Sequence, residues 1–118
     1  MKTIPLTKLS EETLRDACSI AVDVDGTLLL WEGEDPGIPG NGTPQPNAVL
    51  IETLRGWKRS DPARELTVWS GMGRVHAAKA VAFLGIEDIA DHIMAKPSVM
   101  FDDAPGWFDS QTMVDVRQ

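Results

Sequence analysis

The sequence has a single cysteine, Cys18, which excludes an intramolecular disulfide and fits a reducing compartment. No apolar run approaches the roughly 20 residues that a helix needs to cross a bilayer. Residues 1–18 also lack the long apolar stretch found in secretory signals. We therefore expect a cytoplasmic protein that does not engage a membrane.

Positive charge is scarce as well. The chain has 11 Lys and Arg against 18 Asp and Glu, which leaves a formal net charge of −7. Because phosphate contacts by Lys and Arg supply most of the affinity for nucleic acid, this balance disfavours tight binding to long nucleic acid. It leaves room for a local basic pocket. The 118 residues suit one domain, so we predict a single domain over residues 1–118.

The hydrophobic pattern predicts alternating strands and helices. Helices are expected over 10–18 (with Ser10 as N-cap), 46–58 and 74–85 (ending at Gly85), and strands over 19–24, 65–70, 91–95 and 98–103. A flap rich in Gly and Pro is expected over 29–45, and "TMVDV" (112–116) could add an edge strand. This alternation favours an α/β fold: a three-layer, Rossmann-like parallel sheet with helices on both faces.

Polar side chains stand where the predicted strands end. Carboxyl ends of parallel strands meet at one edge of a sheet, where ligands bind. We therefore expect the following residues to converge there: Asp23, Asp25, Ser70, Gly71, Lys96, Asp102 and Asp103.

That mixture of groups has a specific chemistry. Several carboxylates suit Mg²⁺, which takes oxygen ligands and is often shared with a substrate phosphate. A hydroxyl, a glycine amide near a helix start and a lysine can hold phosphate oxygens. One carboxylate could attack phosphorus, and a second could transfer a proton to the leaving group and later accept one from water.

Four motifs in this order resemble those of the haloacid dehalogenase-like hydrolases. "VDVDGTL" (22–28) is similar to the family's first motif, and "LTVWSG" (66–71) to the second. "KP" (96–97) resembles the third motif, and "VMFDD" (99–103) the fourth. The resemblance implies a capless member of this family, since the flap is too short for a cap domain.

The resemblance also implies roles for the aspartates. Asp23 would be the nucleophile that forms an aspartyl-phosphate, and Asp25 the general acid and then base. The Asp23 carboxylate and the Asp25 backbone carbonyl would help bind Mg²⁺. Asp103 is the preferred direct metal ligand from the fourth motif, with Asp102 in support.

The remaining residues of the motifs would hold phosphate. Gly26 and Thr27 would shape the turn and bring its amides near the phosphate, Ser70 and the Gly71 amide would bind its oxygens, and Lys96 would neutralise charge. Lys96 lies only six positions before Asp102, so it must reach the site from a short connection.

Each feature has a simpler alternative reading. Asp-x-Asp-Gly is also a turn sequence, "DDAPG" could start a loop, Ser70 could be a helix N-cap, and Lys96 could be a solvated surface residue. Further residues are expected to have structural or surface roles: His76, His92 and Arg74, with Trp31 and Trp107 in core or rim packing, and Trp57 and Trp69 in the core.

The sequence therefore predicts a Mg²⁺-dependent phosphatase acting on a phosphate monoester. "WSGMGR" (69–74) resembles the second motif of polynucleotide phosphatases, which favours a nucleotide or a nucleic-acid end as substrate over another small phosphorylated molecule. Two alternatives stay open: a phosphotransferase that uses the same intermediate, and a non-catalytic Mg²⁺-binding interaction domain.

Overall fold

A computed structural model describes residues 1–40 and 42–117, so Asn41 of the predicted flap and Gln118 lie outside the described residues. The elements in chain order are β1 (Lys2–Pro5), η1 (Leu6–Lys8), α1 (Glu11–Arg15), β2 (Ser19–Asp23), β3 (Leu29–Leu30), β4 (Gln45–Pro46), α2 (Ala48–Ser60), β5 (Glu65–Ser70), α3 (Arg74–Leu84), β6 (His92–Ala95), η2 (Pro105–Ser110) and β7 (Thr112–Asp115).

The chain divides into two units. The central unit comprises Ala17–Lys96, and the terminal unit comprises Met1–Asp16 together with Pro97–Gln118. That the whole chain forms a single domain stays a prediction.

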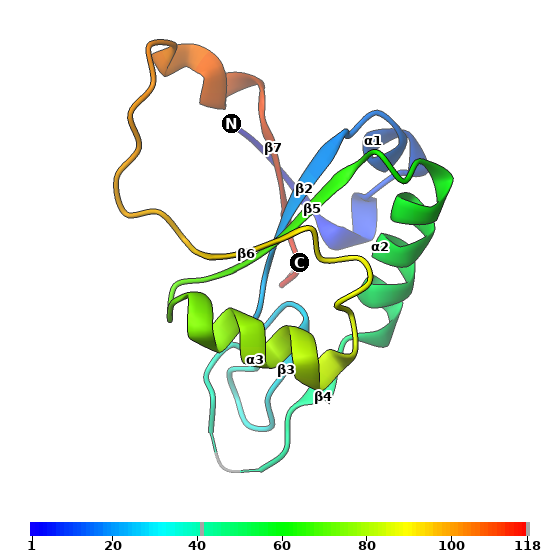
Figure 1. Cartoon of the computed structure of the whole chain (residues 1–118), viewed down its shortest axis with the longest axis vertical. Coiled ribbons are helices and arrows are strands. Elements are labelled where there is room, and N and C mark those ends of the chain that lie inside the picture. The colour runs from blue at the N-terminus through cyan, green and yellow to red at the C-terminus, as the bar shows by residue number, and fades with distance from the viewer. Residues whose placement is uncertain (41, 118) are drawn as a thin grey trace. The chain divides into compact units, whose positions relative to one another are not determined.

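The central unit contains a three-stranded parallel sheet in the order β2-β5-β6. Asp23 pairs with Trp69 across β2 and β5, and Ser70 pairs with Ala95 across β5 and β6. Helix α3 contacts both β5 and β6, and Figure 1 shows β2 (blue) beside β5 (green). The predicted strands over 19–24, 65–70 and 91–95 are confirmed.

Alternating apolar side chains of the sheet build the core of this unit. Val22 and Val24 are buried with Leu66 and Val68, as expected when every second residue of a strand faces the core. Buried side chains of the helices and connections complete it: Leu28, Leu29, Leu54, Trp57, Ala77, Ala80, Val81, Ile86 and Ile89. The predicted core position of Trp57 is confirmed, whereas Trp69 is only half-buried.

The two long helices begin and end at recognisable signals. The Asn47 side chain accepts a hydrogen bond from the Leu50 amide at 3.3 Å and caps α2. The predicted helix over 46–58 therefore starts slightly later, since Pro46 pairs in β4. Helix α3 ends at Gly85 in the left-handed conformation, as predicted, because glycine adopts a positive φ (+65° here) without strain.

The flap is closed at its base and folded back on itself. Its first residues, β3, pair antiparallel with its last, β4. The Trp31 amide donates to the Pro36 carbonyl at 3.0 Å. Gly26 has φ +84°, and a Cβ there would lie 2.7 Å from the Gly37 Cα. The described part of the flap thus packs directly against the Asp25–Gly26 turn.

The terminal unit contains a second, smaller sheet in which β1 and β7 run parallel. The edge strand suggested by "TMVDV" is confirmed over Thr112–Asp115, although its partner β1 was not predicted. Helix α1 begins after Ser10, whose side chain accepts from the Thr13 amide at 3.3 Å, so the predicted N-cap is confirmed.

One predicted strand is wrong. Residues 98–103 form neither helix nor strand, and Phe101 is 97% exposed. The segment has the apolar, β-branched composition of a strand, but β-propensity acts only where a neighbouring strand pairs with the backbone. Within residues 1–40 and 42–117, no strand pairs with it.

The fold is therefore a mixed α/β structure with parallel strands. The part of the chain that the structure describes contains three α-helices, and its strands form three separate small sheets of two, three and two strands rather than one layer. None of the described helices is both long and apolar enough to span a membrane.

Candidate active site

The carboxyl edge of the central sheet gathers three of the predicted site residues. Asp23 ends β2, Ser70 ends β5, and Lys96 directly follows β6. Because the three strands are parallel and in register, their carboxyl ends lie at one edge. The structure thus brings Asp23, Ser70 and Lys96 together at one edge, whereas the predicted strand over 98–103, with Asp102 and Asp103, is not part of this sheet.

Asp23 has a cation beside it. Lys96 Nζ lies 3.0 Å from Asp23 Oδ1, and the Thr27 hydroxyl donates to Asp23 Oδ2 at 3.2 Å. The Asp23 side chain is 32% exposed and that of Lys96 is 42% exposed, so a ligand can approach both. Lys96 therefore reaches the site from its short connection, and it is not merely a solvated surface residue.

Ser70 is buried at 2% exposure and organises the turn that follows it. Its hydroxyl oxygen accepts from the Met72 amide at 3.0 Å, and its carbonyl accepts from the Lys96 amide at 2.9 Å. The alternative reading of Ser70 as a helix N-cap is wrong, because Gly73 occupies that position in α3. A Cβ on Gly71 would meet nothing within 4 Å, so space does not require glycine there.

The turn after β2 uses its amides internally. The Gly26 amide donates to the Leu29 carbonyl at 2.7 Å, and the Thr27 amide donates to the Val24 carbonyl at 3.2 Å. This differs from the expectation that both amides face a phosphate. In this structure Thr27 contributes to the site through its hydroxyl, and Gly26 through its close approach to Gly37.

Two contacts to Asp25 were missed by the sequence analysis. The Trp31 indole Nε1–H donates to Asp25 Oδ1 at 2.9 Å, and His76 Nε2 lies 2.8 Å from Asp25 Oδ2. Both residues were expected to have structural or packing roles. The position of His76 in the first turn of the helix after the second motif was a usable signal, since that turn starts near the same edge of the sheet.

The two remaining acids belong to the terminal unit. The Asp102 carboxylate accepts from the Ala104 amide at 2.7 Å, so it does initiate a turn, as the loop reading of "DDAPG" anticipated. Asp103 is exposed in the same irregular segment. Among residues 1–40 and 42–117, no three His, Cys, Asp or Glu side chains are grouped as ligands of one metal ion.

The oxygen atoms of the central unit nevertheless fit Mg²⁺. This ion is commonly held by one or two protein carboxylates, completed by waters and substrate phosphate. The Asp23 carboxylate, 32% exposed, offers an oxygen of this type, and the Asp25 carbonyl lies two residues further along the chain. A hard oxygen donor set of this kind suits Mg²⁺ better than a softer transition metal.

The other residues singled out in the sequence lie outside this cluster. His92 Nε2 pairs with Glu65 Oε1 at 3.1 Å, and both side chains are largely exposed. Arg74 is exposed at the start of α3, in agreement with its expected surface role. Trp107 is 51% exposed in the terminal unit.

The chain was compared with known proteins at three levels: no family model matches it, and neither does a curated protein or a solved structure. The likeness to the haloacid dehalogenase-like hydrolases therefore remains a resemblance of sequence motifs.

Proposed function

We propose that the protein is a Mg²⁺-dependent phosphatase of the haloacid dehalogenase-like class, which hydrolyses a phosphate monoester through an aspartyl-phosphate on Asp23. The finer fold that goes with this function is a capless, three-layer Rossmann-like domain. The observation that carries the proposal is the cluster at the carboxyl edge of β2, β5 and β6, where Lys96 Nζ lies 3.0 Å from Asp23 Oδ1 and Asp25 follows two residues later.

In the first step the Asp23 carboxylate attacks phosphorus and the bond between phosphorus and the leaving oxygen breaks. The Asp25 carboxyl group transfers its proton to that oxygen, so the alcohol leaves neutral. Lys96 and Ser70 contribute hydrogen-bond donors for the phosphoryl oxygens. Because Lys96 already contacts Asp23, it remains close to the charge that develops during transfer.

In the second step water attacks the phosphorus of the aspartyl-phosphate. Asp25, now a carboxylate, accepts a proton from this water, and the bond between Asp23 and phosphorus breaks. Phosphate leaves and both carboxyl groups return to their starting states. The same intermediate would react with an alcohol in a phosphotransferase, so the acceptor alone separates the two activities.

Mg²⁺ would be held by the Asp23 carboxylate and the Asp25 backbone carbonyl, with waters and the substrate phosphate completing its coordination. When bound, the ion offsets negative charge on the substrate phosphate. The further ligands that the family resemblance implies, Asp103 with Asp102 in support, belong to the terminal unit and stay a prediction.

The substrate is proposed to be a nucleotide or a phosphorylated nucleic-acid end, taken up at an open site. The described flap is short and folds back on the Asp25–Gly26 turn, so it leaves no room for a cap domain. The net charge of −7 favours a short or terminal ligand over a long polyanion.

The test is phosphate release from a panel of esters by purified protein, with Mg²⁺ and with a chelator. The panel runs from a nitrophenyl phosphate to nucleotides and to 3′- and 5′-phosphorylated oligonucleotides. We expect Asp23→Asn to lower turnover at least ~1,000-fold, because the amide is a poor nucleophile. Glu52→Gln, on the exposed face of α2, is the matched control and should leave turnover unchanged.

Undiminished hydrolysis by Asp23→Asn would overturn the mechanism. Formation of an alkyl phosphate with an added alcohol would show phosphotransfer. Mg²⁺ binding without release of phosphate from any ester would favour the non-catalytic interaction domain.

A further inference from the structure

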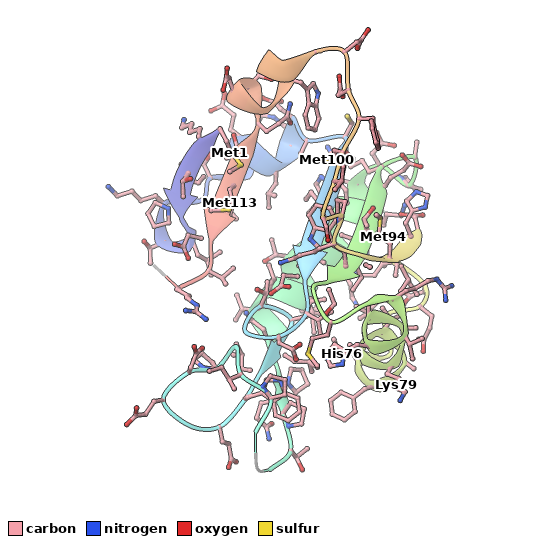
Figure 2. The ribbon with its side chains drawn as sticks, turned by 90° about the vertical axis from the view of Figure 1, so that its left-hand side faces the viewer. Met1, His76, Lys79, Met94, Met100 and Met113 are labelled. Carbon is pink, nitrogen blue, oxygen red and sulfur yellow. The ribbon has the colours of Figure 1, made fainter. Side chains whose placement is uncertain are left out.

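The side chain of Asp25 is held on both oxygens. It is only 10% exposed, the Trp31 indole N–H donates to Oδ1 at 2.9 Å, and His76 Nε2 lies 2.8 Å from Oδ2. Figure 2 shows His76 on α3, with Lys79 on the same helix extending away from it. One partner thus comes from the flap and the other from a helix 51 residues further along the chain.

Together these two partners fix the orientation of the Asp25 carboxylate. An indole N–H can only donate a hydrogen bond, so Trp31 constrains Oδ1 to accept. The imidazole of His76 is directional and sits on a packed helix, whose neighbouring Ala77 is fully buried. A carboxylate with one partner can rotate about its terminal torsion, whereas a carboxylate bound at each oxygen cannot rotate without breaking a bond.

Asp23 has a different set of partners. Its oxygens contact Lys96 and the Thr27 hydroxyl, and neither group touches Asp25 in the contacts of the central unit described above. The two carboxylates therefore have separate supports. Asp23 lies beside a cation that can also meet phosphate, while Asp25 is held by two side chains that need not touch the substrate.

We propose that His76 and Trp31 are positioning residues for Asp25, holding its carboxyl group in the orientation needed for proton exchange with the leaving oxygen and with water. This inference rests on the proposed function. A general acid contributes to rate only when it lies within hydrogen-bond reach of the leaving oxygen, and small misplacements lower the rate strongly.

The orientation of Asp25 depends on how the flap packs against the turn that follows β2. Trp31 is held by a hydrogen bond that its backbone N–H donates to the Pro36 carbonyl, and Gly37 lies against Gly26, the residue after Asp25. A flap displaced from this turn would withdraw the Trp31 indole from Asp25. The flap therefore positions an acid–base group in addition to covering the turn.

The leaving group provides the decisive measurement. Departure of a nitrophenolate needs little proton transfer, whereas departure of an alkoxide needs a well-placed acid. For His76→Leu we expect kcat/KM to fall ~10- to 100-fold with an alkyl phosphate and much less with nitrophenyl phosphate. His76→Gln keeps a side-chain group that can hydrogen-bond Asp25 and should recover most of the loss, and Trp31→Phe should show the same leaving-group pattern as His76→Leu.

The controls separate positioning from folding. His92→Leu removes the other histidine–carboxylate pair, away from the cluster, and should leave kcat/KM unchanged for both substrates. Asp25→Asn should show the same leaving-group pattern as His76→Leu but with a larger loss. Thermal unfolding of each variant checks that the fold is retained.

Three results would overturn the proposal: an equal loss with both substrates, a gain in kcat, or a Gln variant no better than Leu. If the wild type is active and Asp23→Asn is inactive, any of these removes only the positioning role. If Asp23→Asn keeps its activity, or no ester is hydrolysed, the proposed function fails and the role fails with it. The NMR signal of the Trp31 indole N–H in Asp25→Asn then still reports whether the contact exists.

Discussion

The central unit buries 13 apolar side chains, between Val22 and Ile89, whereas no terminal-unit residue whose exposure the structure describes is buried. Both units contain parallel strands, α-helix and a capped helix start. They differ in what covers the sheet: α3 contacts β5 and β6 in the central unit, while β1 and β7 form an isolated two-stranded ladder. Since two-stranded sheets are marginal in water, we infer that the central unit owes its stability mainly to buried apolar area rather than to strand pairing.

The largest expected loss of stability comes from a substitution in the core of the central unit. Trp57 is 5% exposed and its indole N–H donates to the Ala17 carbonyl at 3.0 Å. We expect Trp57→Ala to lower the free energy of unfolding by about 3–5 kcal/mol. Phe101→Ala in the terminal unit, where the ring is 97% exposed, should change it by less than about 0.5 kcal/mol. Similar losses of unfolding free energy for the two variants, measured by urea denaturation, would refute this contrast between the two units.

A smaller effect tests the close packing of flap and turn. A Cβ at Gly26 would lie 2.7 Å from the Gly37 Cα, and its φ of +84° disfavours any L side chain. Gly26→Ala is expected to lower the free energy of unfolding by about 1–3 kcal/mol and to reduce activity through Asp25. Gly71→Ala is the matched control, because a Cβ there meets nothing within 4 Å. Equal melting temperatures for the two variants would contradict the described flap.

A pH-dependent effect concerns the ion pair between α2 and the start of β6. Asp91 Oδ2 lies 2.6 Å from Lys58 Nζ and accepts from the Leu66 amide at 2.8 Å. Burial raises the pKa of Asp91, but these hydrogen bonds outweigh it, so the pKa lies below the usual 3.8.

A lowered pKa in the folded state stabilises the fold above the usual pKa, and this contribution is lost as the pH falls through the folded-state value. Asp91→Asn should therefore lower the free energy of unfolding at neutral pH by about 1 kcal/mol. Its difference from the wild type should shrink as the pH falls below 3.8 and vanish only below the lower pKa of Asp91 in the folded state. A difference in unfolding free energy that persists in acid would refute the ion pair as its cause. Asp88→Asn removes a more exposed pair with Arg55, so its unfolding free energy at neutral pH should fall by less.

The smallest effect belongs to the terminal unit. Ser10→Ala removes the cap of α1, a helix of five residues, and we expect a loss of about 0.5 kcal/mol. Ser10→Asn keeps a side-chain acceptor and should restore stability. Hydrogen exchange makes the test more specific: in Ser10→Ala the amides of α1 should exchange faster, while those of β5 should not change. Faster exchange in both units would contradict the contrast between them.

Local features of this protein were determined by the sequence alone. The strands over 19–24 and 65–70, the helix after Asn47, the Ser10 cap and the Gly85 end each depend on a few neighbouring residues. The parallel order also followed from the alternation of strands and helices, and with it the convergence of Asp23, Ser70 and Lys96.

Only the tertiary structure decided which side chains meet. His76 reaches Asp25 across 51 residues, and Lys96 reaches Asp23 from beyond β6, because sheet register and the seating of α3 set those distances. The same reason explains the wrong strand over 98–103: its composition suits a strand, but a strand exists only where a partner backbone accepts its hydrogen bonds, and no local pattern encodes that partner.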